Sequence, residues 1–173
     1  MSGPQTATIP VDFLARFTAS EQFEKVFKEG MGLVEETANY LDGEGRKDAR
    51  LLDRHGAVAY ATESMRLTTR LMQLASWLLV QRAIGSGEMN QEDAGKEKHR
   101  ISLTDIGRGN PLQGGEQLPA GLIDLVERSL RLHGRVLKLD VMVNMQAKAI
   151  QQQANPVDHH LDRIASVFNA ARG

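Results

Sequence analysis

Apolar residues recur along this chain at the three- and four-residue spacing of an α-helix, in three long stretches. The most apolar stretch, residues 59–83, contains neither glycine nor proline. A helix that is apolar on more than one face is normally covered on more than one side. This stretch is predicted to be the central helix of a bundle because it carries two apolar lines: Leu67, Leu71, Leu74 and Leu78, and Met65, Met72, Leu79 and Ala83.

A first helix is predicted from about residue 18 to residue 42. Its apolar positions keep the helical spacing, and Thr18 lies three residues before Glu21, which is the spacing of a capping box. The sequence Asp-Gly-Glu-Gly at residues 42–45 then predicts a turn, because glycine favours the position after a helix C-terminus. A turn this short predicts that the first two helices pack antiparallel.

The second predicted helix runs from about Arg46 to Ile84, and Gly56 is the expected place for a bend. Residues 86–118 show no sustained period, so they are predicted to form a long loop, a kind of segment that is often functional or mobile. A loop of this length can return the chain in either direction. A third helix is predicted from Pro119 to about residue 150, because proline suits the first position of a helix.

Both ends of the chain differ from the bundle, which is predicted to span residues 18–153. Residues 1–17 contain two prolines and are expected to be a flexible lead-in. Residues 154–173 are predicted to form a separate tail helix, because Asn155 is a good N-cap and Pro156 suits the first turn. The predicted fold is all-α: an elongated antiparallel three-helix bundle with a long loop between helices two and three and a short C-terminal amphipathic helix.

Composition narrows the class of protein. The chain has 173 residues, of which 41% are hydrophobic and 5% aromatic, so one domain with a core of Leu, Met, Val and Ala is expected. A net charge of −1 argues against a nucleic-acid-binding protein, and the absence of cysteine excludes disulfides and thiolate sites. Because neither a secretory signal nor an apolar run long enough for a membrane span is present, a soluble cytoplasmic protein is expected.

No pattern of catalytic, metal-binding or cofactor-binding residues stands out. The cluster Asp158-His159-His160-Leu161-Asp162 contains adjacent histidines that would point about 100° apart on a helix, so a solvated helix face is favoured over a metal site. The Gly-x-Gly pairs at 43–45 and 107–109 follow no strand and are interpreted as turns. His133 lies on an apolar line and is interpreted as a hydrogen-bonded core or groove histidine. We therefore expect no enzyme activity, no metal and no cofactor.

Two sets of residues are candidates for protein contact. Along the second helix, a polar strip interrupts the apolar lines. One interpretation is a solvated face, with Glu63 pairing to Arg66 or Arg70. The other is a contact surface, since Arg and Trp are common interface anchors. The apolar line of the tail either docks on its own bundle as a fourth helix or acts as a tethered recognition helix. The candidates are Glu63, Arg66, Arg70 and Trp77, with Gln73 and Gln81 on the same strip, and Leu161, Ile164 and Phe168 in the tail.

Two blocks of the sequence resemble a known family. FKEGMGLVEETANYLDGEGR at residues 27–46 and AYATESMRLTTRLMQLASWLLVQRA at residues 59–83 are similar to the alphaproteobacterial family of the regulator of CtrA degradation, RcdA. NPLQGGE at residues 110–116 is a shorter point of similarity. The two long blocks cover about a quarter of the chain and keep the family's spacing, whereas the tail offers no family motif.

The resemblance implies a non-enzymatic adaptor in regulated proteolysis, built as a helical bundle that can form a homodimer. Such an adaptor tethers selected substrates, among them a cell-cycle transcription regulator, to the ClpXP protease. The implied partners are ClpXP, a response regulator (CpdR-like), a cyclic-di-GMP-binding adaptor (PopA-like) and protein cargo, without nucleic acid or a membrane span. The implied location is the cytoplasm, with concentration at a cell pole through partners. The alternatives left open by the residues are a structural homodimerisation module and a small-ligand-binding bundle that uses His133.

Overall fold

The computed structural model describes the backbone of residues 9–103 and 107–170, and the side chains of residues 13–150 within these ranges, apart from those of residues 91, 92, 98 and 99. It confirms the predicted all-α class. The helices in chain order are α1 (Ile9–Thr18), α2 (Glu21–Asp42), α3 (Glu44–Ala49), α4 (Arg54–Gly85), α5 (Gln91–Arg100) and α6 (Ala120–Ala170), with one 3₁₀ turn, η1 (Gly115–Gln117), before α6.

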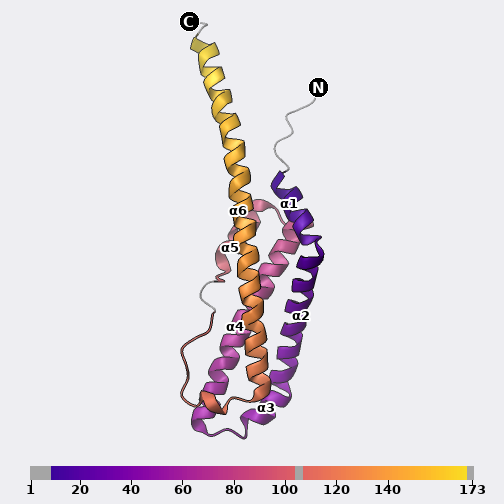
Figure 1. The fold of residues 1–173 in the computed structure, drawn as a ribbon, viewed down its shortest axis with the longest axis vertical. Coiled ribbons are helices and arrows are strands. Elements are labelled where there is room, and N and C mark those ends of the chain that lie inside the picture. The colour runs from indigo at the N-terminus through magenta and orange to yellow at the C-terminus, as the bar shows by residue number, and fades with distance from the viewer. Residues whose placement is uncertain (1–8, 104–106, 171–173) are drawn as a thin grey trace.

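Helices α2, α4 and α6 form the bundle, with α1 continuing the line of α2 and α6 extending past the other helices (Figure 1). As expected, α2 is antiparallel to α4. However, α6 runs parallel to α4, because Arg70 contacts Ser129 and Trp77 contacts Asp140 in the same chain order. The description of the bundle as antiparallel therefore holds for α2 and α4 but not for α6, whose direction the long loop had left open. The cause is the long connection after α4, which returns the chain along the whole bundle before α6 begins (Figure 1).

The central helix buries only one of its two predicted apolar lines. Leu67, Leu71, Leu74 and Leu78 lie in the core with residues of α2 and α6. In contrast, Met72 is 65% exposed and Leu79 is 52% exposed. The second line is therefore an apolar surface of the bundle rather than part of its interior.

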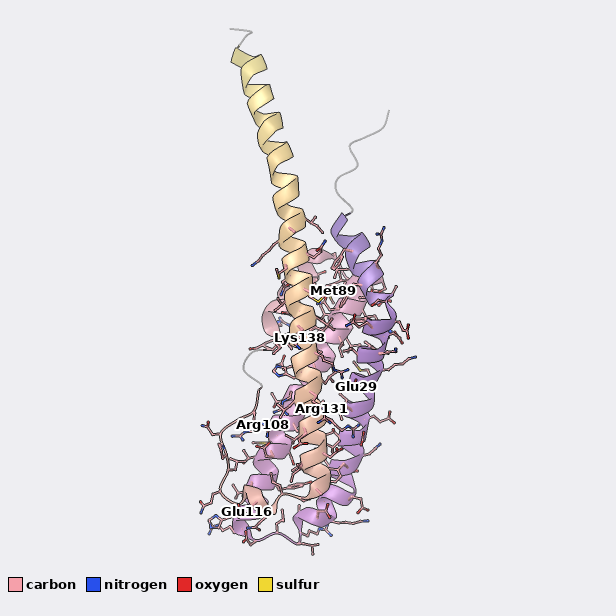
Figure 2. The ribbon with its side chains drawn as sticks, in the orientation of Figure 1. Glu29, Met89, Arg108, Glu116, Arg131 and Lys138 are labelled. Atoms are coloured by element: carbon pink, nitrogen blue, oxygen red, sulfur yellow. The ribbon has the colours of Figure 1, made fainter. Side chains whose placement is uncertain are left out.

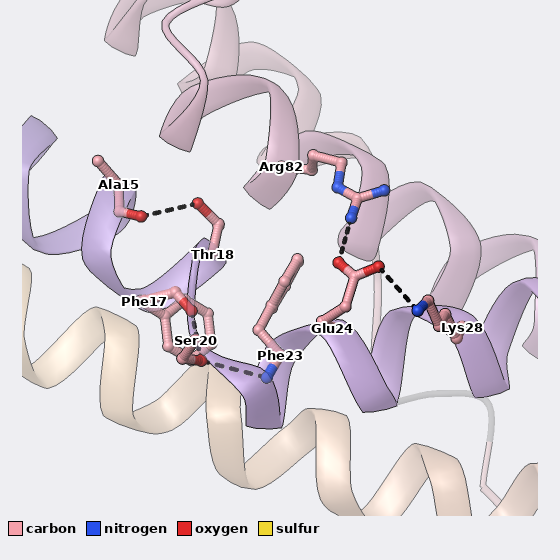
Figure 3. Close-up of polar contacts among 8 residues, drawn as sticks. All are labelled: Ala15, Phe17, Thr18, Ser20, Phe23, Glu24, Lys28 and Arg82. Carbon is pink, nitrogen blue, oxygen red and sulfur yellow. Dashed lines mark hydrogen bonds and ion pairs between the residues drawn. The ribbon is translucent and has the colours of Figure 1, made fainter.

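The N-terminal junction differs from its prediction, because residues 9–18 are helical and the helix that follows is capped by Ser20 (Figure 3). The Ser20 hydroxyl accepts a hydrogen bond from the backbone N–H of Phe23 at 3.2 Å. Thr18 instead donates to the carbonyl of Leu14 at 2.8 Å, within the last turn of α1. The capping-box spacing was misleading, since Ser20 is an equally good N-cap and lies directly before the apolar periodicity of α2.

The predicted second helix is divided into α3 and α4. Asp53 caps α4, because its carboxylate accepts from the N–H of Gly56 at 2.9 Å and from the side-chain amide of Gln117 at 3.0 Å. Gly56 thus lies in the first turn of a new helix rather than at a bend. Aspartate is one of the favoured N-cap residues, so Asp53 is a capping signal that competes with helix continuation.

The two other corrections concern the predicted loop and tail. Residues 86–118 contain a helix, α5, and the turn η1, so this connection is only partly irregular. The predicted separate helix over residues 154–173 is instead the last part of α6, whose backbone is helical as far as Ala170. A proline such as Pro156 removes one helical hydrogen bond and disfavours the helical conformation of the residue before it. It does not compel the chain to begin a new helix.

Gly114 determines how the returning chain meets the start of α4. Its φ is +83°, and a Cβ atom there would lie 2.5 Å from the backbone carbonyl carbon of His55. We predict that Gly114→Ala lowers the free energy of unfolding by about 2 kcal/mol or more, from left-handed strain and steric overlap. The matched control is Gly115→Ala, where the nearest atom is a full 4.0 Å from the added carbon. Urea denaturation of both variants measures the difference, and equal losses would contradict the close approach.

Candidate functional site

The polar strip of α4 is buried against α6. Arg70 is 1% exposed, and its guanidinium donates to the Ser129 hydroxyl at 2.8 Å and to the Gly107 carbonyl at 3.3 Å. Burial lowers the pKa of Arg70 below its usual range; Glu63 opposes this shift, and the charges of Arg108 and Arg66 add to it. An arginine nevertheless stays charged in proteins, so Arg70 is a buried cation whose hydrogen bonds must be satisfied internally.

Trp77 lies on the same buried strip. It is 2% exposed, and its indole N–H donates to one oxygen of Asp140 at 2.7 Å, while the Asn144 side chain donates to the other oxygen at 3.0 Å. Gln81 is also fully buried, and its amide has no hydrogen-bond partner among the described residues. Arg70 and Trp77 therefore form neither a solvated face nor an exposed contact surface. They lie in an internal polar seam between α4 and α6.

The returning segment, which we call the strap (residues 101–103 and 107–118), is held by side chains of the bundle. The carbonyl of Leu103 contacts His133 Nε2 at 2.5 Å, and the carbonyl of Asn110 accepts from Arg66 at 3.1 Å. Since a carbonyl can only accept, Nε2 of His133 carries the proton. His133 is thus a hydrogen-bonded core histidine, as predicted, and its Nε2 is occupied by the strap rather than open to a ligand.

Glu63 and Arg66 form an ion pair, with Arg66 donating to the carboxylate at 2.7 Å. This is one of the two pairings that the solvated-face interpretation of the strip included. Both side chains are largely covered, and Arg66 also lies against Gly109 of the strap. Glu63 belongs to the wall of a cleft between the strap and α6, and Arg66 lies beside it. Their role in the described structure is to position the strap.

This strap cleft has a volume of about 370 Å³. Its walls combine apolar side chains of the strap and α6 with charged side chains. Figure 2 shows Arg108 and Glu116 at different heights along the strap, so the charges are distributed along the cleft. The apolar members are Leu112, Leu118, Ile123, Val126 and Leu130, and the charged members are Glu63, Arg70, Arg108, Glu116 and Glu127.

A second concave surface lies between α2 and α4, and we call it the α2–α4 groove. It has a volume of about 390 Å³ and is predominantly apolar. The buried hydroxyl of Thr37 lines it without a hydrogen-bond partner in the described structure. Exposed apolar surfaces of this kind are typical of protein-contact sites and of ligand-binding grooves. Its lining residues are Val34, Thr37, Ala38, Leu41, Thr68, Leu71, Met72, Ala75, Ser76 and Leu79.

The sequence reasoning missed both surfaces, although one signal for the groove was present. The line through Met72 and Leu79 was recognised, but it was expected to be covered within the bundle. The strap cleft left no signal, because it depends on the path of a segment without periodicity. The side chains of the tail candidates Leu161, Ile164 and Phe168 lie outside the described part of the chain, so their roles stay predictions.

The described residues also bear on metal binding and on membrane insertion. Within residues 13–150, as far as their side chains are described, no group of three or more histidine, aspartate or glutamate side chains could hold a metal ion. No helix in the described ranges combines the length and the apolar character needed to cross a bilayer. The predicted absence of enzyme activity and of cofactors stays a prediction.

Comparisons with known proteins agree with the resemblance in the sequence. A family model with the description "Protein of unknown function (DUF1465)" matches residues 14–168. The chain is also similar to the crystal structure of RcdA from Caulobacter crescentus CB15, with 50% sequence identity and a TM-score of 0.58. This alignment covers 75% of the present chain and 96% of the RcdA chain. No match was found among curated proteins.

The internal role of Arg70 gives a direct prediction. Arg70→Met leaves the Gly107 carbonyl and the Ser129 hydroxyl without their charged donor, so we expect a loss of about 2–4 kcal/mol in the free energy of unfolding. We also expect faster amide hydrogen exchange in residues 107–118. The matched control is Arg108→Met, which removes a neighbouring exposed arginine. If both variants unfold and exchange like the wild type, Arg70 is not a structural residue.

Proposed function

This chain belongs to the RcdA family, and on that premise we propose that it is a non-enzymatic adaptor that tethers selected protein substrates to the ClpXP protease. The observation that carries the proposal is 50% identity over 96% of the RcdA chain. The proposed partners are ClpXP, a CpdR-like response regulator, a PopA-like cyclic-di-GMP-binding adaptor and cargo such as a cell-cycle transcription regulator. The proposal includes a homodimer that acts in the cytoplasm and is concentrated at a cell pole by its partners.

The arrangement of surfaces supports tethering. The strap cleft lies between the strap and α6, whereas the α2–α4 groove is lined by other residues of α4, so the two surfaces lie on different sides of the central helix. An adaptor accelerates degradation by raising the effective concentration of cargo at the protease, which requires two partner-binding surfaces on one particle. The proposed homodimer presents two strap clefts, one on each copy, and the α2–α4 groove lies apart from both.

The structure changes which residues are proposed to contact partners. Because Arg70 and Trp77 are buried, a partner could reach them only if α4 and α6 separated. We assign the contact instead to exposed residues around the strap cleft, chiefly Ile123 and Arg108. Glu63 and Arg66 then act indirectly, by holding the strap beside α6.

The proposal predicts faster degradation of cargo in a reconstituted assay. ClpXP, the CpdR-like and PopA-like proteins and a cell-cycle regulator as cargo would be combined with and without the present chain. We expect faster loss of the cargo when the chain is present. RcdA from Caulobacter crescentus serves as the positive control. If that control accelerates degradation and the present chain accelerates none of the cargo tried, the adaptor function is contradicted.

A variant of the strap cleft tests where the partner binds. Ile123 is 41% exposed and lines the cleft, so Ile123→Asp should leave the thermal melt nearly unchanged. The same change should reduce the acceleration of degradation about tenfold, which corresponds to about 1.4 kcal/mol of binding. Val141→Asp is the matched control, because Val141 is a 55% exposed aliphatic residue on the same helix outside the cleft. Equal acceleration by the two variants would exclude the strap cleft as the contact surface.

A further inference from the structure

An apolar surface in the described structure and an apolar line in the sequence each lack an assigned partner. The first is the α2–α4 groove, where Met72 and Leu79 are more than half exposed. The second is the end of α6, where the sequence places apolar residues at spacings of four, three and four. We call this set the α6 stripe: Val157, Leu161, Ile164 and Phe168.

The α2–α4 groove is a place where a further helix could pack on the bundle. Helices α2 and α4 pack antiparallel, and each contributes one wall of small and apolar side chains. A further helix laid between them would complete a four-helix arrangement on this side of the bundle. The unpartnered hydroxyl of Thr37 in the wall would then also come within reach of polar atoms of the added helix.

The α6 stripe needs a partner surface. The backbone of α6 is one continuous helix, and its end extends beyond the other described helices without a neighbour (Figure 1). A single amphipathic helix is only marginally stable in water, and its apolar face is normally buried against another element. The stripe is therefore expected to be covered in the assembled protein.

The lengths of the two surfaces match. On α4 the groove extends from Thr68 to Leu79, a difference of eleven residues. The stripe extends from Val157 to Phe168, which is also a difference of eleven residues. At the rise of an α-helix both are about 16 Å long, so one helix segment could lie along the whole groove.

The end of α6 cannot reach the groove of its own chain. Trp77 contacts Asp140 between parallel helices, so Leu79, at the end of the groove, lies level with about residue 142 of α6. The stripe begins at Val157, about 22 Å further along the same continuous helix and directed away from the groove. A second copy of the chain is the partner that has a suitable groove and that the proposed function already includes.

We propose that the α6 stripe of one copy lies in the α2–α4 groove of a second copy, and that the second copy's stripe lies reciprocally in the groove of the first. The resulting dimer has two identical contacts related by a two-fold axis. Each docked segment runs antiparallel to α4 of the copy that receives it. This inference rests on the homodimer in the proposed function, but it does not depend on ClpXP or on cargo.

Size-exclusion chromatography with light scattering on the full chain measures the oligomeric state. This measurement tests the reciprocal contact between the α6 stripe and the α2–α4 groove. The groove variant is Met72→Glu with Leu79→Glu, both exposed in the described structure, and the stripe variant is Leu161→Glu with Phe168→Glu. We expect a wild-type dimer and at least a tenfold weaker self-association of each variant. The matched control is Leu51→Glu with Val58→Glu, two exposed apolar residues outside both surfaces, which should remain dimeric.

Mixing the groove variant with the stripe variant distinguishes the proposed reciprocal dimer from dimers formed through other surfaces. The groove variant keeps an intact stripe and the stripe variant keeps an intact groove, so the mixture retains one contact and should form a heterodimer. If the stripe variant stays as dimeric as the wild type, the groove pairs with another surface and the proposal is wrong. A wild type that is monomeric at about 100 µM, or a mixture that stays monomeric, also overturns it. Because no protease is present, these failures are separate from any failure of the degradation assay.

Discussion

The buried guanidinium of Arg70 is the constraint on which most of the structure depends. A cation placed in the interior must be hydrogen-bonded there, and Arg70 is satisfied by Ser129 of α6 and by the backbone of the strap at Gly107. Together with the bond from Trp77 to Asp140, this seam sets the register between α4 and α6 and requires the two helices to run parallel. A parallel pair needs a connection as long as the bundle, and the strap provides it. The strap cleft follows from the same arrangement, whereas the apolar groove lies on the opposite side of α4 and is formed by α2 and α4.

Apolar periodicity predicted the three long helices and the helical class, because a repeat at three and four residues follows from the geometry of a helix alone. It could not predict which apolar line of α4 is covered, since Leu71 and Met72 are adjacent residues whose burial depends on where α2 and α6 lie. The interpretation of the polar strip as a solvated face or a contact surface failed for the same reason. An arginine and a tryptophan on an apolar helix suit either an interface or a buried seam, and the deciding partners, Ser129 and Asp140, are about sixty residues away in the sequence. Local capping signals at Thr18 and Asn155 were each compatible with more than one helix boundary.

Family membership and structure contribute different parts of the functional account. Membership of the RcdA family is the basis of the proposed adaptor role, whereas the structure indicates which surfaces are available for it. The residues with the strongest interface character in the sequence are internal, so the contacts are assigned to Ile123 and Arg108 at the strap cleft and to the groove between α2 and α4. In the proposed dimer the groove is occupied by the end of α6, which leaves the strap cleft of each copy free for cargo or protease. An adaptor of this design would bind its partners through surfaces that its own dimer contacts do not use.

The most direct test of this account uses Trp77, the single tryptophan of the chain. Acrylamide quenching of its fluorescence and hydrogen exchange of its indole N–H report on the polar seam alone. We predict weak quenching and slow indole exchange in the full chain, and no change in either when ClpXP, the upstream adaptors and cargo are added. Strong quenching of the free protein, or protection that appears only when a partner binds, would contradict the account. It would show that the polar strip of α4 is a contact surface rather than the seam that holds the bundle together.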